Sequence, residues 1–164
     1  MAEHRFDIVC EIDNQEVSNV LQQCQKEALQ RYDLKDANPT FDFQEKTQKI
    51  IFKAKDDFKV KAIVEIFKQK VVKRSLSVKA FQFSESERIG GDFAKIEATI
   101  QQGIDQKNAK IITKTIKDQK FKVQCTIQGD QLRVSSKKID ELQAVMKCIR
   151  ELNLDVYTHF KNLQ

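Results

Sequence analysis

Strict alternation of apolar and polar residues is the clearest pattern in this chain, and it is most regular between residues 121 and 128. Apolar side chains stand at positions 121, 123, 125 and 127, with polar side chains between them. The turn-forming pair Gly129-Asp130 follows, and the alternation resumes at Leu132 and Val134. A period of two around a tight turn predicts a β-hairpin with one buried face and one solvated face.

The same kind of analysis divides the rest of the chain into short strands and amphipathic helices. In the first half we expect a strand at 5–13, a helix at 14–31, paired strands at 41–43 and 50–54, a helix at 56–74 and a strand at 78–83. A polar connector at 84–91 contains Gly90-Gly91 and is the best candidate for a domain boundary. In the second half we expect a strand at 92–102, helices at 105–119 and 138–152 on either side of the hairpin at 121–136, and a strand at 156–160.

Each half therefore has the order strand–helix–strand–strand–helix–strand. This order is typical of ferredoxin-like folds, in which two helices cover one face of a four-stranded antiparallel sheet. The sequence predicts an α+β protein with two tandem ferredoxin-like domains, at residues 1–90 and 91–164.

The composition supports a folded, soluble chain with a modest basic bias. Of 164 residues, 40% are apolar, and the 11 Phe, single Pro and four Gly favour packed cores over disorder. The formal net charge is +5, and residues 91–164 hold 13 Lys or Arg against nine Asp or Glu. The start of the chain is too charged for a signal peptide, and no apolar run is long enough to span a membrane, so we expect a cytoplasmic protein.

The sequence contains no recognisable catalytic centre, and we expect no enzymatic activity. Both glycine-rich phosphate-binding patterns, Gly-x-x-x-x-Gly-Lys-Ser/Thr and Gly-x-Gly-x-x-Gly, are absent. The two histidines, His4 and His159, stand near opposite ends of the chain. The four cysteines are widely spaced and fit reduced core positions better than zinc or disulfide sites, so no metal or cofactor is expected. Asp7, Glu11 and Asp13 alternate outward; they could be paired carboxylates, but we interpret them as a solvated or salt-bridged strand face.

The most distinctive group of charged residues is basic. Along the helix predicted at 105–119, lysines spaced three or four residues apart form one stripe, which Lys120 and Lys122 continue into the hairpin. Arg133, Lys137 and Lys138 fall in the same half of the chain. Such a stripe can neutralise phosphates, or it can be the solvated face of an amphipathic helix. We predict phosphate contacts from Lys110, Lys114, Lys117, Lys122 and Arg133, with base or ribose contacts from Gln124 and Gln128.

Several segments resemble the bacterial YajQ family over essentially the whole chain. They are Phe-Asp-Ile-Val-Cys-Glu-Ile-Asp at 6–13, Gln-Gly-Ile-Asp at 102–105, Ile-Lys-Asp-Gln-Lys-Phe-Lys-Val-Gln at 116–124, Ile-Gln-Gly-Asp-Gln-Leu-Arg-Val at 127–134 and Asp-Glu-Leu-Gln-Ala-Val-Met at 140–146. The resemblance implies two ferredoxin-like domains whose first strands, 5–13 and 92–102, are exchanged. It also implies nucleotide or nucleic-acid binding, with cyclic di-GMP as the ligand of some members, and no catalysis. The family's terminal arginine and the Arg-x-x-x-Arg signature of cyclic di-GMP sites are absent here.

Two functional hypotheses follow from these observations. In the first, the protein binds an anionic nucleotide (ATP, GTP or cyclic di-GMP), tRNA or another RNA through a basic surface of the second domain. The predicted outward faces of the hairpin strands carry no aromatic residue, so base stacking on the sheet is disfavoured. In the second, the protein is a chaperone-like or interaction adaptor that binds a protein partner through its open sheet faces.

Overall fold

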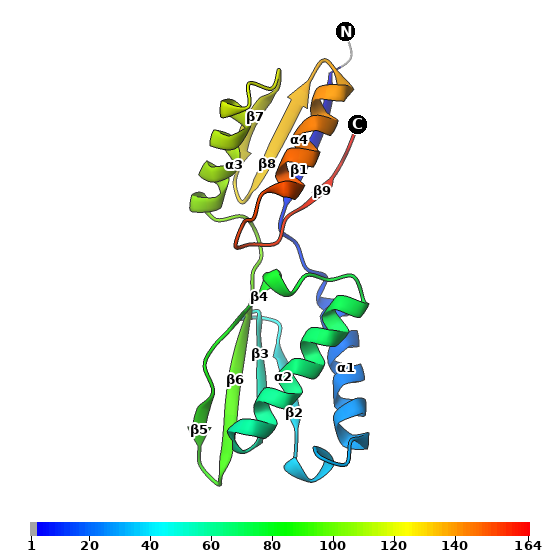
Figure 1. Ribbon diagram of the computed structural model, residues 1–164, viewed down its shortest axis with the longest axis vertical. Coiled ribbons are helices and arrows are strands. Elements are labelled where there is room, and N and C mark those ends of the chain that lie inside the picture. Colours follow the sequence, from blue (N-terminus) through cyan, green and yellow to red (C-terminus); the bar gives the residue numbers. More distant parts are fainter. Residues whose placement is uncertain (1–2) are drawn as a thin grey trace. The chain divides into compact units, whose positions relative to one another are not determined.

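The computed structural model describes residues 3–164, which form two compact units. We call residues 3–11 with 102–164 unit 1, and residues 12–101 unit 2. Helices and strands alternate along the chain (Figure 1) in the order β1(His4–Val9), α1(Asn14–Gln30), η1(Lys35–Ala37), β2(Thr40–Gln44), β3(Lys49–Lys55), α2(Asp56–Lys73), η2(Val78–Ala80), β4(Phe81–Phe83), β5(Glu87–Ile89), β6(Phe93–Ile100), α3(Gln106–Asp118), β7(Gln124–Gln128), β8(Gln131–Ser136), α4(Ile139–Glu151) and β9(His159–Lys161).

Unit 1 is a four-stranded antiparallel sheet in the order β7-β8-β1-β9, with α3 and α4 packed on one face. The β1–β8 register places Phe6 opposite Val134 and Ile8 opposite Leu132. These four side chains are fully buried against the apolar stripes of α3 and α4, which include Ile112. The alternate residues of each strand consequently point to the other face of the sheet.

Unit 2 repeats this layered arrangement with the sheet order β2-β3-β6-β4, and β5 pairs with the free part of β6. Phe52 on β3 is fully buried at its centre, and its ring lies 5.2 Å from that of Phe67 on α2 and 5.7 Å from that of Phe41 on β2. Both helices lie over one face of the sheet (Figure 1). The four α-helices and two antiparallel sheets confirm the α+β class and are consistent with two ferredoxin-like domains.

The first strand of each half of the sequence lies in a sheet with strands of the other half. β1 pairs with β8 and β9, which come from the last third of the chain, and β6 pairs with β3 and β4. The division of the chain into domains 1–90 and 91–164 stays a prediction. The prediction of a polar connector at 84–91 was wrong in one respect. Residues 87–89 form the strand β5, and the side chain of Ile89 is half-buried opposite Phe93.

Candidate functional site

A cavity of unit 1 lies where the regular pairing of the β7–β8 hairpin ends. Gln124 opposite Ser135 is the last paired position of the hairpin at this end. Beyond it the regular pairing stops, and residues of the two segments line an open space of about 440 Å³. We call this the basic pocket; its lining residues are Glu3, Phe121, Lys122, Val123, Gln124, Ser135, Ser136, Lys137 and Lys138.

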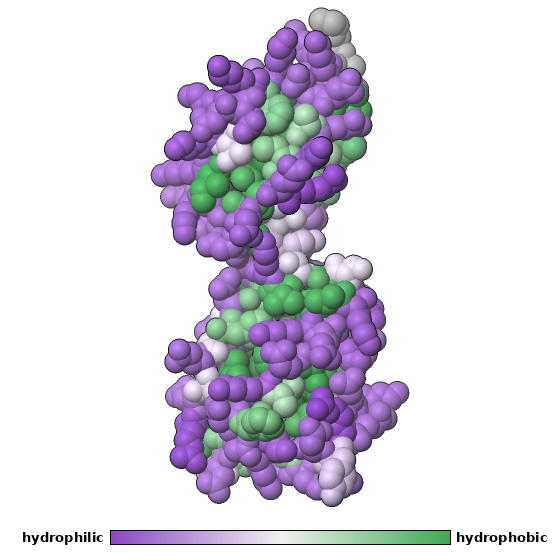
Figure 2. Space-filling model, in the orientation of Figure 1, coloured by the Kyte–Doolittle hydropathy of each residue, from purple (hydrophilic) through white to green (hydrophobic). Residues whose placement is uncertain are grey.

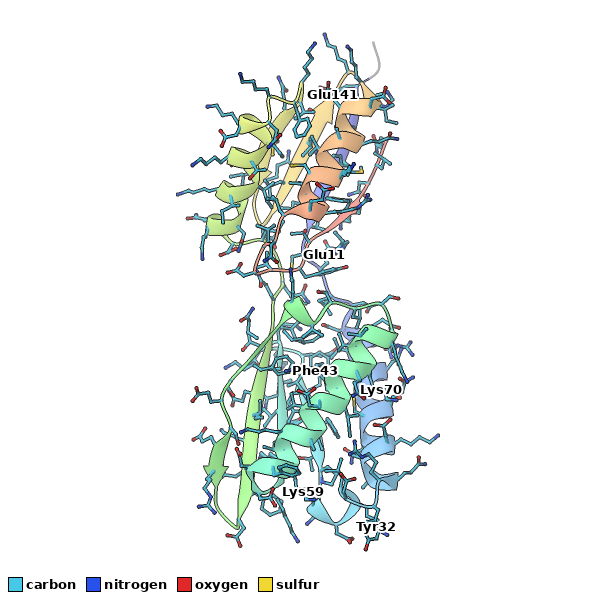
Figure 3. The ribbon with its side chains drawn as sticks, in the orientation of Figure 1. Glu11, Tyr32, Phe43, Lys59, Lys70 and Glu141 are labelled. Carbon is cyan, nitrogen blue, oxygen red and sulfur yellow. The ribbon has the colours of Figure 1, made fainter. Side chains whose placement is uncertain are left out.

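Hydrogen bonds from a buried serine hold the two sides of the basic pocket in place. The Ser136 hydroxyl donates to the carbonyl oxygen of Lys122 at 2.9 Å and accepts from the backbone amide of Lys138 at 3.2 Å. The backbone amide of Lys122 also donates to the Glu141 carboxylate at 3.3 Å. Glu141 lies in the first turn of α4, at the end of unit 1 where β8 ends (Figure 3). Both lysine-bearing segments are thus anchored by their backbones, which leaves the ammonium groups exposed.

The charge around the pocket favours anions. Lys122, Lys137 and Lys138 are all exposed, whereas Glu3 is the one acidic residue in the lining. The pocket also adjoins the start of α4, where the helix dipole favours negative charge; Asp140 and Glu141 in the first turn offset part of that effect. In Figure 2 hydrophilic residues cover most of this end of unit 1. Ammonium groups beside serine hydroxyls are suited to phosphate, and the half-buried Phe121 offers an apolar surface to a base.

The structure brings two of the predicted contact residues, Lys122 and Gln124, together in this pocket. Lys110, Lys114 and Lys117 are exposed on the outer face of α3, turned away from the buried Ile112 and Ile116.

The other two predicted residues, Gln128 and Arg133, lie on the face of the sheet opposite to the helices. The strand period places them there, because Leu132 and Val134 face the helices. Gln128 is next to the hairpin turn, about 13 Å along β7 from Gln124 by strand rise. The sheet therefore separates these two residues from the lysines of α3.

Arg133 is held by Asp7, one of the acidic residues expected on a solvated or salt-bridged strand face. Its Nε donates to the Asp7 carboxylate at 3.0 Å, and the Asn162 amide donates to the other oxygen at 2.8 Å. Asp7 is only 1% exposed, so of the two environments expected for this face, solvated or salt-bridged, it has the salt-bridged one. Burial alone would raise the pKa of Asp7, but the hydrogen bonds from Arg133 and Asn162 outweigh burial and lower it. A buried strand carboxylate is tolerated because it is paired.

Phe121 and Ser135 were not anticipated at a binding site. The alternation assigns Phe121 to the core face, and Ser135 is an ordinary polar strand residue. Nothing in the local sequence signals that β7 begins at Gln124 rather than at residue 121, and the pocket lies beside the residues that β7 leaves out. The adjacent Lys137 and Lys138 are the signal that was available, because two consecutive lysines directly follow a strand.

The described residues offer little support for metal or thiol chemistry. Within residues 3–164, no group of three or more His, Cys, Asp or Glu side chains could hold a metal ion. None of the four cysteines, all in the described part of the chain, forms a disulfide. Burial raises the pKa of Cys10 to about 11 and that of Cys24 to about 12, which makes both poor nucleophiles at neutral pH.

Membrane insertion through a helix finds no support either, since no helix in the described part of the chain has the length and apolarity needed to cross a bilayer.

Over nearly its whole length the chain is similar to proteins that are named for nucleotide binding. A family model described as "Nucleotide-binding protein YajQ-like" matches residues 4–164. A protein of Chloroherpeton thalassium named "Nucleotide-binding protein" is 40% identical over 157 residues, covering 96% of this chain and 95% of its own length. One of the same name from Heliobacterium modesticaldum is 42% identical over 159 residues, covering 97% of this chain and 96% of its own.

Proposed function

The chain belongs to the YajQ-like family of nucleotide-binding proteins, and we propose that it binds the phosphate of an anionic nucleotide or of RNA in the basic pocket of unit 1, without catalysis. ATP, GTP and cyclic di-GMP are the nucleotides to test first. The role is that of a binding protein, in which recognition of the ligand is itself the activity.

One observation carries the proposal: a pocket of nucleotide size with three exposed lysines on its rim. Its volume of about 440 Å³ falls in the range of small-molecule sites, which is roughly 300–1,000 Å³. Two other cations of this sheet, Arg133 and Lys161, are already paired with Asp7 and Glu11. No ion pair of Lys122, Lys137 or Lys138 is seen among the described residues, so these three lysines are available to an anion.

The side chains divide the work between charge and orientation. The three lysines contact phosphate oxygens as point charges, and the Ser135 hydroxyl adds a hydrogen bond. Gln124, at the end of the paired hairpin, has an amide that can both donate to and accept from a base or a ribose hydroxyl. Arg133 has no part in this site, because Asp7 already engages its guanidinium.

The test is a charge reversal in the pocket compared with an equal charge reversal elsewhere. Lys122→Glu combined with Lys137→Glu places two carboxylates at the pocket. The control, Lys26→Glu combined with Lys46→Glu, changes two exposed lysines of unit 2 and gives the same net charge. Binding of ATP, GTP, cyclic di-GMP and tRNA is measured by the rise in melting temperature and by direct titration at low and moderate salt.

We expect the pocket variant to lose binding of whichever of these probes stabilises the native protein, while the control keeps it. Both variants should fold, because the side chains replaced are exposed. Equal loss in the two variants would mean that net charge, rather than a site, attracts the ligand. If no probe stabilises the native protein at either salt concentration, the adaptor hypothesis becomes the better account, and a protein partner insensitive to nucleotide should be sought.

A further inference from the structure

The outer edge of the unit 1 sheet, formed by β7, is a surface that a ligand in the basic pocket does not use. We propose that this edge takes up an extended segment of a protein partner as a fifth strand, and that acidic side chains of the segment pair with Lys110, Lys114 and Lys117 of α3. The inference does not rest on the proposed function of the pocket. It concerns the edge of the sheet, and it states the chemistry of the partner: a short uncharged strand with an acidic residue at each end.

The backbone of β7 presents hydrogen-bonding groups along this edge. β7 pairs with β8 alone and ends the sheet order β7-β8-β1-β9. Gln128 and Gln131 flank the two-residue turn and form a hydrogen-bonded pair, and hydrogen-bonded and non-hydrogen-bonded pairs alternate along the hairpin. The amide and carbonyl groups of Cys125 and Ile127 therefore point away from β8. Within residues 3–164, neither residue makes a backbone hydrogen bond outside the sheet.

β7 also lacks the features that usually keep an edge strand from pairing. Its five residues, Gln-Cys-Thr-Ile-Gln, include no charge and no proline. Ile127 is 53% exposed although the strand period turns it to the helix side, because no strand beyond β7 covers it. The opposite edge of the sheet, β9, has only three residues and contains Lys161, which is paired with Glu11. A strand added beyond β7 would cover Ile127 and satisfy the outward backbone groups.

The charge beside this edge favours an acidic segment. α3 lies over β7, whereas α4 contacts β8 and β1. The side of α3 that is turned away from α4 is therefore the side of the outer edge, and side chains that end in nitrogen project from the helix there (Figure 3). Lys110, Lys114 and Lys117 are exposed, and no ion pair involves them in the described part of the chain. They can consequently pair with carboxylates that a fifth strand brings to the same place.

The spacing of these lysines matches one face of an extended strand. At a rise of 1.5 Å per residue, Lys110 and Lys117 are about 10.5 Å apart along the axis of α3. Two acidic residues four positions apart in a strand point to the same face and are about 13 Å apart. An apolar residue midway between them points to that face too and would contact Ile127. The residues between these positions point to the open face beside Thr126, where polar side chains fit. The sequence Glu-Thr-Val-Thr-Glu meets all three requirements.

Hydrogen exchange of single amides tests the proposal on the native protein. The probe is the peptide acetyl-Ser-Glu-Thr-Val-Thr-Glu-Ser-amide, and exchange is followed by NMR. In the protein alone, the outward amides of Cys125 and Ile127 should exchange faster than those of Thr126 and Gln128, which are bonded to β8. At saturating peptide we expect the two outward amides to slow at least about tenfold, with little change in the other two. One control peptide has Pro in place of Val, and a second has Lys in place of Glu.

Two variants separate the backbone from the charge. Ile127→Pro removes one outward donor, and proline is tolerated on an edge strand whose amide faces solvent. It should weaken the peptide at least about tenfold while circular dichroism shows a native fold. Lys110→Gln/Lys117→Gln should weaken it about threefold or more, and the loss should shrink at high salt. The control Lys26→Gln/Lys46→Gln, on unit 2, should bind as the native protein does.

Four outcomes would overturn the inference. Unchanged exchange at Cys125 and Ile127 in saturating peptide would show that the edge accepts no strand, and this result does not depend on any variant folding. Equal binding of the peptide with Pro would show that backbone pairing is not the mode of contact. Equal binding of the peptide with Lys would show that the lysines of α3 do not select the segment. Protection of the two outward amides that rises with protein concentration, together with a dimer in sedimentation, would assign the edge to a second copy of this chain.

Discussion

Replacement of Arg133 by alanine distinguishes a structural role for this arginine from the phosphate contact that the sequence suggested. The change leaves the Asp7 carboxylate, which is 1% exposed, with the Asn162 amide as its remaining side-chain donor. Loss of a hydrogen bond to a charged group costs roughly 1.5–3 kcal/mol. Because the Arg133 side chain is 33% exposed, water can replace part of the interaction, and we expect the free energy of unfolding of unit 1 to fall by about 2 kcal/mol.

The pH dependence of this loss follows from the pKa of Asp7. Burial opposes ionisation, but hydrogen bonds from Arg133 and Asn162 bring the pKa below its ordinary value. A carboxyl group with a depressed pKa in the folded state stabilises the protein above its unfolded pKa of about 3.9, and this stabilisation disappears as the pH falls through the folded pKa. The difference between the native protein and Arg133→Ala should therefore be complete at neutral pH and shrink below about pH 4.

Urea unfolding followed by circular dichroism gives the stability, and oligouridylate or ATP titration of the same samples gives the affinity. Lys161→Gln is the matched control, since it removes a partly exposed ion pair with Glu11 on the same face of unit 1 and should cost less than about 1 kcal/mol. We expect Arg133→Ala to lose stability and keep its affinity. A variant of native stability that no longer binds would refute the reasoning and make Arg133 a ligand contact.

Three further predictions concern the backbone, the core and the thiols. Gly103→Ala should lower the free energy of unfolding by about 1–3 kcal/mol, because the φ of Gly103 is +86° and an added Cβ would lie 2.5 Å from the Asp130 carboxylate. In the control Gly90→Ala, the added Cβ has no other atom within 4 Å, and the free energy of unfolding should change by less than about 0.5 kcal/mol. Phe52→Ala should cost about 3–5 kcal/mol in urea unfolding, whereas Phe58→Ala, 76% exposed, should be nearly neutral; equal effects would contradict the assignment of the core. Burial raises the pKa of the Cys24 thiol to about 12, so Cys24 should react with iodoacetamide only as fast as the protein unfolds. Fast labelling of the native protein would show that α1 opens locally.

The pattern of apolar residues was sufficient for most elements of this fold. The alternation around Gly129-Asp130 predicted the hairpin that the structure contains as β7 and β8, and the helical spacing predicted all four α-helices. These predictions succeed because a strand or helix that buries one side has apolar residues at the spacing of its own backbone period. The short β5 was missed, since three residues are too few to display a period.

The candidate site was predictable in part. A basic bias in the second half, the lysines of α3 and the exposed polar face of the hairpin are properties of the sequence. That Lys122 and Gln124 share a pocket with Ser135 and Lys138 is not, because the pocket exists where hairpin pairing stops. The separation of Arg133 from the α3 lysines likewise depends on which side of the sheet the helices cover.

By itself, then, the sequence determined the local elements, the faces they bury and the sign of their charge. Tertiary structure decided which strands share a sheet, and with it the environment of each side chain. Asp7 shows the difference: its place in the alternation allows either solvent or an ion pair. The sheet decides between them, because β8 brings Arg133 beside Asp7 and the residue after β9 brings Asn162. The physical reason is that hydrophobic periodicity is set within one element, whereas every strand offers the same backbone donors and acceptors along its edges. The choice of partner therefore depends on contacts between residues far apart in the chain.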